Sequence, residues 1–171
     1  MWPYLSDCVS SDPSKAEIFI LQDRFGAAAK RVRDRMTQAV LPIEATIIKV
    51  DKARLDELLD NDEIKGIIAA LGVGIDVDET STLFDIGKLR YGKIIIVVDA
   101  GGDGTHISSQ VLAFLRRFNY PVVAAGHVYL CGADMSVRMG DEQFTAKVMA
   151  PATRGLVRVE PGPKPGGRID G

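Results

Sequence analysis

The feature that most constrains this chain is a short apolar run, Ile94–Val98, followed at once by an acidic, glycine-rich turn. The run is rich in β-branched residues, bounded by charge and too short for most helices, so it predicts a buried parallel strand. The turn contains Asp99 and Asp103, and apolar residues then recur at helical spacing between positions 107 and 118. The order of strand, acidic turn and helix is typical of the places where open α/β sheets bind ligands.

The turn itself allows two interpretations. Glycines and aspartates often occupy such turns for backbone geometry alone. Alternatively, Asp99 and Asp103 could hold a divalent cation, because carboxylate oxygens are the ligands that hard cations prefer. His106 could act as a base or ligand, or could simply be a solvated or capping residue at the start of the helix. The local pattern leaves both interpretations open.

Composition narrows the class of protein. The chain has 171 residues, with 23 acidic against 21 basic side chains, which suggests one domain and does not require a nucleic-acid partner. Two distant cysteines, Cys8 and Cys131, have no metal-ligand spacing and indicate reduced thiols in a cytosolic protein. The first residues do not resemble a secretory signal, and no window has the length of a membrane span. We therefore expect a cytoplasmic protein without a membrane segment.

A second strand–turn–helix unit lies near the start of the chain. Ile18–Leu21 predicts a strand, the following turn contains Asp23, and residues 27 to 36 are expected to form a helix. That helix would carry a group of basic residues, which either form a solvated face or contact DNA. They are Lys30, Arg31, Arg33 and Arg35.

The remaining elements complete an α/β pattern. We expect Pro42 to end a segment, a strand over Ala45–Val50, two short amphipathic helices that end at Gly72, a connector over 121–125 and a strand over 127–130. This order predicts a mostly parallel sheet of about four strands flanked by helices. Residues 1–160 would form the domain, and the Pro- and Gly-rich residues 161–171 a flexible tail.

Several segments of the chain resemble one family, the toprim domain of the B subunit of bacterial DNA gyrase, a type IIA topoisomerase. The resemblance covers roughly residues 5 to 160 and implies the Rossmann-like toprim fold. It rests mainly on Leu5–Cys8, Asp12–Ile20, Phe84–Tyr91, Asp99–His106 and Gly126–Leu130.

The resemblance also implies a metal site, from which this chain departs. In the family, a glutamate after the first strand and an Asp-x-Asp-x-Asp turn bind divalent metal, usually magnesium, and assist DNA cleavage and religation. Here the glutamate position is Leu21 and the middle aspartate is Gly101, whereas Asp99 and Asp103 remain. We expect at most weak Mg²⁺ binding at these two aspartates. A basic segment of the family is also replaced, with Glu44 in its place.

These changes suggest a first hypothesis. No counterpart of the ATPase domain or of the cleavage-tyrosine domain is evident in the chain, so we expect a free-standing toprim-like protein that is not a topoisomerase by itself. Its former active-site cleft, made more apolar, could bind a small organic molecule and transform it without metal. The polar candidates are Asp23, Arg24, Asp99, Asp103 and His106, and the ligand-binding candidates are Leu21, Gln22, Phe25, Gly101 and Gly102.

Other hypotheses stay open. Leu21 and Phe25 could simply fill the vacated site. The chain would then be a binding module, such as a regulator, decoy or self-protection factor that binds the gyrase A subunit or, weakly, DNA. A third hypothesis is residual magnesium-dependent nicking of DNA. The sequence does not predict the oligomeric state.

Overall fold

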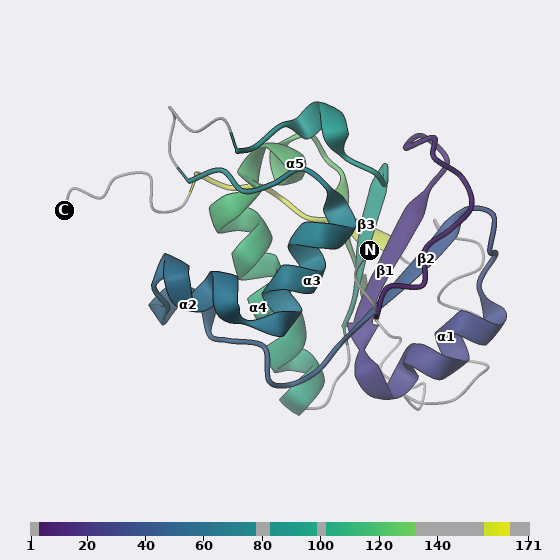
Figure 1. The fold of residues 1–171 in the computed structure, drawn as a ribbon, viewed down its shortest axis with the longest axis horizontal. Helices are drawn as coiled ribbons and strands as arrows, with labels where there is room; N and C mark the ends of the chain where they lie inside the picture. The colour runs from purple at the N-terminus through teal and green to yellow at the C-terminus, as the bar shows by residue number, and fades with distance from the viewer. Residues whose placement is uncertain (1–3, 78–82, 99–101, 133–155, 165–171) are drawn as a thin grey trace.

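A five-stranded sheet forms the centre of the computed structural model, which describes residues 4–77, 83–98, 102–132 and 156–164. The strand order is β2-β1-β3-β4-β5, and β2, β1 and β3 are labelled side by side in Figure 1. The first four strands pair in parallel and the short β5 joins β4 antiparallel. The strands are β1 (Glu17–Gln22), β2 (Gln38–Ile43), β3 (Lys93–Val98), β4 (Val128–Gly132) and β5 (Leu156–Arg158).

Helices cover both faces of this sheet. In the part of the chain that the structure describes, α1 lies on one face, whereas α3 and α4 pack on the other (Figure 1). The helices are α1 (Gly26–Val32), α2 (Leu55–Asp60), α3 (Asp62–Leu71), α4 (Gly102–Phe118) and α5 (Tyr120–Ala124), with 3-10 turns η1 (Asp23–Phe25), η2 (Val50–Lys52) and η3 (Ile86–Lys88). None of the described helices is both long and apolar enough to cross a membrane.

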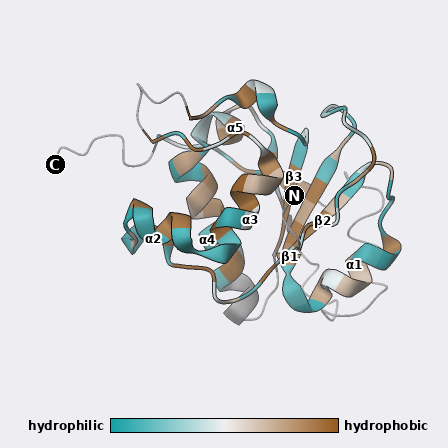
Figure 2. Ribbon diagram, viewed as in Figure 1, coloured by the Kyte–Doolittle hydropathy of each residue, from teal (hydrophilic) through white to brown (hydrophobic). Residues whose placement is uncertain are grey.

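Burial on both faces explains why the central strands are continuous apolar runs (Figure 2). Along β1, Ile18 and Ile20 enter the larger core beneath α3 and α4. Phe19 and Leu21 alternate with them and enter a smaller core beneath α1. The predicted α/β class, the strand over Ile94–Val98 and the helix that follows it are confirmed. The two amphipathic helices are also confirmed, and Gly72 ends α3 in a left-handed conformation, with φ of 79°.

The expected strand over Ala45–Val50 is wrong, because the strand lies earlier, in β2, and contains Pro42. β2 is an edge strand of the described sheet. The N–H and C=O groups of Val40 point outward and bond to Ser6. Pro42 lies two residues later, so its nitrogen faces the same outward side and its missing N–H costs no ladder bond with β1.

Two other boundaries differ from expectation. Helix α1 ends at Val32 rather than near Met36, and Arg33 is already extended, with φ of −67° and ψ of 158°. The connector expected over 121–125 is largely the short helix α5, in which Pro121 lies at the start, where a missing N–H is tolerated. The segment after β5 begins by lying against the domain, since the Tyr120 hydroxyl donates to the Gly162 carbonyl at 2.5 Å.

Candidate functional site

The carboxyl end of β1 is apolar where the sequence resemblance placed a metal ligand. Leu21 and Phe25 are each only 3% exposed, and both belong to the smaller core with Phe19 and Val97. Their neighbours in that core are other apolar side chains from β2, β3, β4 and α1. Burying two such side chains contributes roughly 1.5–3 kcal/mol each. These residues therefore fill the space beneath α1 and stabilise the fold.

The polar residues of the same turn lie at its rim. Asp23 and Arg24 are exposed in η1, and the Arg24 guanidinium lies 4.7 Å from the centre of the Phe25 ring. Gln22 is half-buried, and its side-chain oxygen Oε1 is buried with no hydrogen-bond partner among the described residues. The structure thus brings together five predicted site residues. Leu21 and Phe25 lie in the core, and the polar side chains of residues 22–24 lie at its rim.

The second half of the predicted site is only partly described. His106 lies in the first turns of α4, and its Nε2 is 3.2 Å from the Ile47 carbonyl. Because a carbonyl can only accept, Nε2 carries the hydrogen in this contact, and His106 ties α4 to the segment after β2. Asp99 and Gly101 lie outside the described residues, as does the side chain of Asp103, whereas Gly102 is the first residue of α4. The expected carboxylate pair is therefore not placed.

The described residues do not fit a metal centre. No group of three His, Cys, Asp or Glu side chains able to hold an ion occurs among them. At the carboxyl end of β1, Leu21 offers no oxygen ligand, and hard cations such as Mg²⁺ require several. Among the described residues of this turn, Asp23 supplies one carboxylate, fewer than a hard cation needs.

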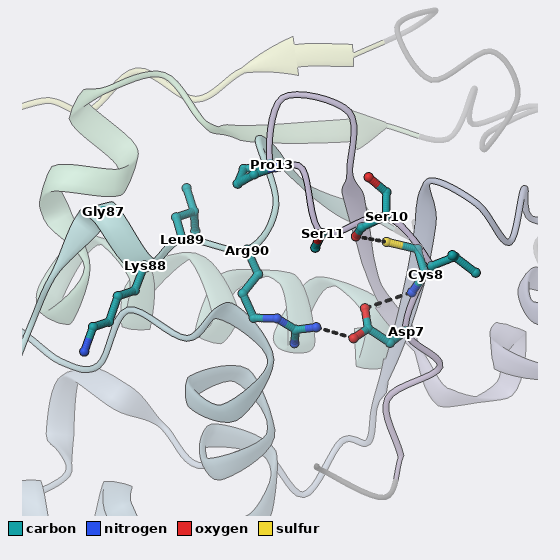
Figure 3. Close-up of a pocket in the computed structure, with 10 residues that line it drawn as sticks. Asp7, Cys8, Ser10, Ser11, Pro13, Gly87, Lys88, Leu89 and Arg90 are labelled. Atoms are coloured by element: carbon teal, nitrogen blue, oxygen red, sulfur yellow. Dashed lines mark hydrogen bonds and ion pairs between the residues drawn. The ribbon is translucent and has the colours of Figure 1, made fainter.

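A polar network that the sequence did not predict joins the N-terminal segment to the loop that leads into β3 (Figure 3). Asp7 accepts from the Tyr91 hydroxyl at 2.6 Å, from the Arg90 guanidinium and from its neighbour's backbone N–H, that of Cys8, at 2.8 Å. Burial raises the pKa of Asp7, but the hydrogen bonds from Tyr91 and Arg90 outweigh it and lower the pKa below its usual value. Both segments lie in the part of the chain that resembles the family, yet nothing in their spacing, more than 80 residues apart, indicates this contact.

The family follows from a comparison with known domains. The family model described as the Toprim domain matches residues 17–131, from the first residue of β1 into β4. The chain belongs to the Toprim family. The matched span contains the four parallel strands and the helices between them, so the described fold is the toprim scaffold itself.

Individual relatives are the B subunits of topoisomerases. The toprim chain is 48% identical over 142 residues to the novobiocin-sensitive DNA gyrase B subunit of Streptomyces niveus, covering 82% of this chain and 20% of the relative. It is 50% identical over 145 residues to the type 2 topoisomerase B subunit of Aquifex aeolicus, covering 84% and 18%. The DNA gyrase B subunit of Mycobacterium tuberculosis is 50% identical over 127 residues. The chain spans about a fifth of the length of these curated relatives.

The expected basic helix of this toprim domain is not formed as predicted. Only Lys30 and Arg31 lie on α1, because the helix ends at Val32. Arg33 turns inward, where its Nη1 donates to the carbonyls of Ser6, Asp7 and Gln38 at 2.8–3.0 Å. This guanidinium is used to join the N-terminal segment to β2, so the run offers DNA less positive charge than its sequence suggests.

Proposed function

We propose that this toprim domain does not cleave DNA and acts as a non-catalytic binding module for topoisomerase subunits. The observation that carries the proposal is the burial of Leu21 and Phe25 in one core at the carboxyl end of β1. In the family pattern a glutamate occupies the position of Leu21, as a metal ligand and candidate for proton transfer. A leucine can do neither, and its place in the core leaves no room there for a hydrated cation.

The extent of identity supports a role shared with the gyrase B subunits. The chain is 48% identical over 142 residues to one of them and keeps the parallel sheet of the domain, although its metal position is altered. A retained domain beside an altered metal position is the combination expected when docking persists and cleavage chemistry does not.

The charge of this domain favours a protein partner over DNA. The net charge is −2, and Arg33 is turned into the domain. Affinity for DNA rests largely on cationic contacts to phosphates. The relatives carry the name of subunits, so their partner subunit is the natural candidate for this chain as well.

The first test is binding to the gyrase A subunit of Streptomyces coelicolor, whose gyrase B subunit is 47% identical to this chain. We expect a complex by calorimetry that is equally tight in Mg²⁺ and in EDTA, because no step of docking uses a metal. We also expect the chain to inhibit supercoiling by the reconstituted enzyme and to produce no nicked plasmid. Mg²⁺-dependent nicking, or no complex with the A subunit, would overturn the proposal.

A second candidate function, binding of a small organic molecule at the rim of the old site, is favoured by one observation. Oε1 of Gln22 is buried without a partner among the described residues, next to the exposed Asp23 and Arg24. Such an acceptor is costly unless a ligand or water donates to it, by about 1–3 kcal/mol.

This candidate can be tested with phenol, which combines an apolar ring with one donor. We expect phenol to raise the melting temperature of the wild-type chain, and expect Gln22→Leu to abolish that shift while stabilising the free protein by about 1 kcal/mol. Lys52→Gln, at an exposed residue of η2 on the other face of the sheet, serves as the control and should retain the shift. An equal shift in Gln22→Leu would dismiss the rim as a ligand site.

A further inference from the structure

The face of the sheet that α1 covers carries a row of polar side chains at its amino end. In the strand register, Glu17 lies beside Gln38 on one side and Lys93 on the other. Tyr129 lies opposite Ile95, two residues beyond Lys93, and Arg158 lies opposite Tyr129. Side chains alternate between faces, so the polar row projects from the same side of the sheet as Leu21 but at the opposite end of the strands. The row consists of Glu17, Gln38, Lys93, Tyr129 and Arg158.

Helix α1 is too short to cover this end. It has seven residues, of which Ala29 and Val32 pack in the smaller core with Leu21 and Phe25. The polar row opens into a hollow of about 350 Å³, bounded by the loops that precede β1, β3 and β4. The hollow is lined by Lys15, Glu17, Lys93, His127, Tyr129 and Arg158, together with small loop residues.

Positive charge predominates in this hollow. It contains the three cations of Lys15, Lys93 and Arg158 against the single carboxylate of Glu17. Glu17 is 9% exposed and its Oε1 accepts from the Gln38 side chain at 3.0 Å. Within the described parts of the chain, none of the three cations forms an ion pair. No described carboxylate therefore holds these cations in a salt bridge, although Glu17 acts on Lys93 and Asp12 on Lys15 at longer range.

The aromatic ring of Tyr129 keeps two of the cations close. The Lys93 ammonium lies 5.9 Å and the Arg158 guanidinium 5.5 Å from the ring centre. Arg158 also donates to the Tyr129 hydroxyl at 3.0 Å. Such cation–π contacts orient long side chains that would otherwise be mobile. The ring thus positions two donors at one wall of the hollow.

His127 adds a further polar group of known orientation. Its Nδ1 lies 2.9 Å from the Gly92 carbonyl. A carbonyl can only accept, so Nδ1 donates in this contact, and the bond fixes the orientation of the ring. The ring is therefore a fixed part of the lining beside the three cations.

We propose that this hollow binds a small phosphate monoester, with Lys15, Lys93 and Arg158 around the phosphate and the organic part along Tyr129. A phosphate monoester carries a charge of about −1.5 to −2 at pH 7, which matches three cations opposed by one carboxylate. The volume falls in the range of small-molecule sites, roughly 300–1,000 Å³. The cations converge on one concave site rather than following an extended track, which favours a small ester over a DNA backbone.

The experiment is a calorimetric titration of the whole chain with phenyl phosphate, and separately with inorganic phosphate, at low salt. We expect Lys93→Gln and Arg158→Gln each to raise the dissociation constant for phenyl phosphate about three- to ten-fold, and the double variant at least ten-fold. Glu17→Gln should lower it a few-fold, because the substitution removes the opposing charge and keeps an acceptor for Gln38. Phenyl phosphate should bind more tightly than inorganic phosphate if the organic part uses Tyr129.

A matched control is Lys52→Gln. Lys52 is exposed in η2, which packs against α4 on the other face of the sheet, so its removal should leave the dissociation constant unchanged. Circular dichroism and thermal melts of each variant establish that folding is intact. The proposal is overturned if Lys52→Gln weakens binding of phenyl phosphate as much as Lys93→Gln does, or if Glu17→Gln weakens it. It is also overturned if a single-stranded oligonucleotide displaces phenyl phosphate and binds more tightly, per phosphate group, than phenyl phosphate does.

Discussion

Replacement of Leu21 by glutamate is expected to lower the free energy of unfolding by roughly 4 kcal/mol. Leu21 is 3% exposed among apolar side chains of the smaller core. The substitution loses about 1.5–3 kcal/mol of apolar burial and places a carboxyl group where the described residues offer no donor, at a cost of about 1–3 kcal/mol even when it is protonated. Urea denaturation at pH 7 measures the loss. Leu21→Met is the control, because a volume-conserving change costs less than about 1.5 kcal/mol.

The pH and metal dependence of this variant separate a filled core from a residual metal site. Burial disfavours the charged form, so the introduced carboxyl should have a raised pKa in the folded state. Its penalty is therefore smaller at low pH and grows as the pH rises through that pKa. Mg²⁺ at about 10 mM should not restore stability. Recovery in Mg²⁺ but not in Na⁺ would mean that the edge still binds metal and would contradict the interpretation of Leu21 as core alone.

The parts of the fold that could be predicted from sequence were those encoded by neighbouring residues. The apolar, β-branched run Ile94–Val98 by itself predicts a buried strand. The apolar residues at helical spacing after position 107 by themselves predict a helix. The strand β2 could not be found in the same way, because Pro42 is tolerated there only by its place at the sheet edge and by the direction of its nitrogen. That direction is a property of the assembled sheet.

The candidate site was predictable to the same extent. The resemblance points to Leu21 and Phe25 as residues of the altered site, but whether they line a cleft or fill a core depends on what packs over them, and the structure places them in a core beneath α1. Arg33 was grouped with a basic helix, although its hydrogen bonds reach carbonyls as many as 27 residues away. The polar row that includes Lys93 and Arg158 depends on strand register, which local patterns do not give.

Removal of the Asp7 side chain is the second change with a large expected effect. Asp7→Ala should lower the free energy of unfolding by about 3 kcal/mol, because it leaves the Tyr91 hydroxyl without its acceptor and Arg90 without its counterion. Tyr91 is only 1% exposed, so water does not readily replace the lost partner. The comparison by urea denaturation should include Tyr91→Phe, which removes the hydroxyl but keeps the ion pair and should cost less.

The dependence of this loss on pH follows from two shifted groups. Burial raises the pKa of Asp7, but its hydrogen bonds lower that pKa by more, so the net shift is downward. The stabilisation from the network is therefore complete above the ordinary carboxyl pKa of about 4. It is lost as the pH falls through the pKa that Asp7 has in the folded protein. Burial and the bond to Asp7 raise the pKa of Tyr91, so stabilisation is complete below about pH 10 and is lost as the pH rises beyond it.

The difference in stability between wild type and Asp7→Ala should therefore be constant from roughly pH 5 to pH 9 and shrink at both extremes. Tyr91→Phe should remove the alkaline decline and preserve the acidic one, because the bond between Arg90 and Asp7 remains. A double-mutant cycle then gives the coupling between Asp7 and Tyr91 directly. A difference that stays constant down to about pH 2 would show that Asp7 acts through packing rather than through its charge. In that case the N-terminal segment would be held to the domain mainly by the three carbonyl contacts of Arg33 and by the Ser6–Val40 bridge.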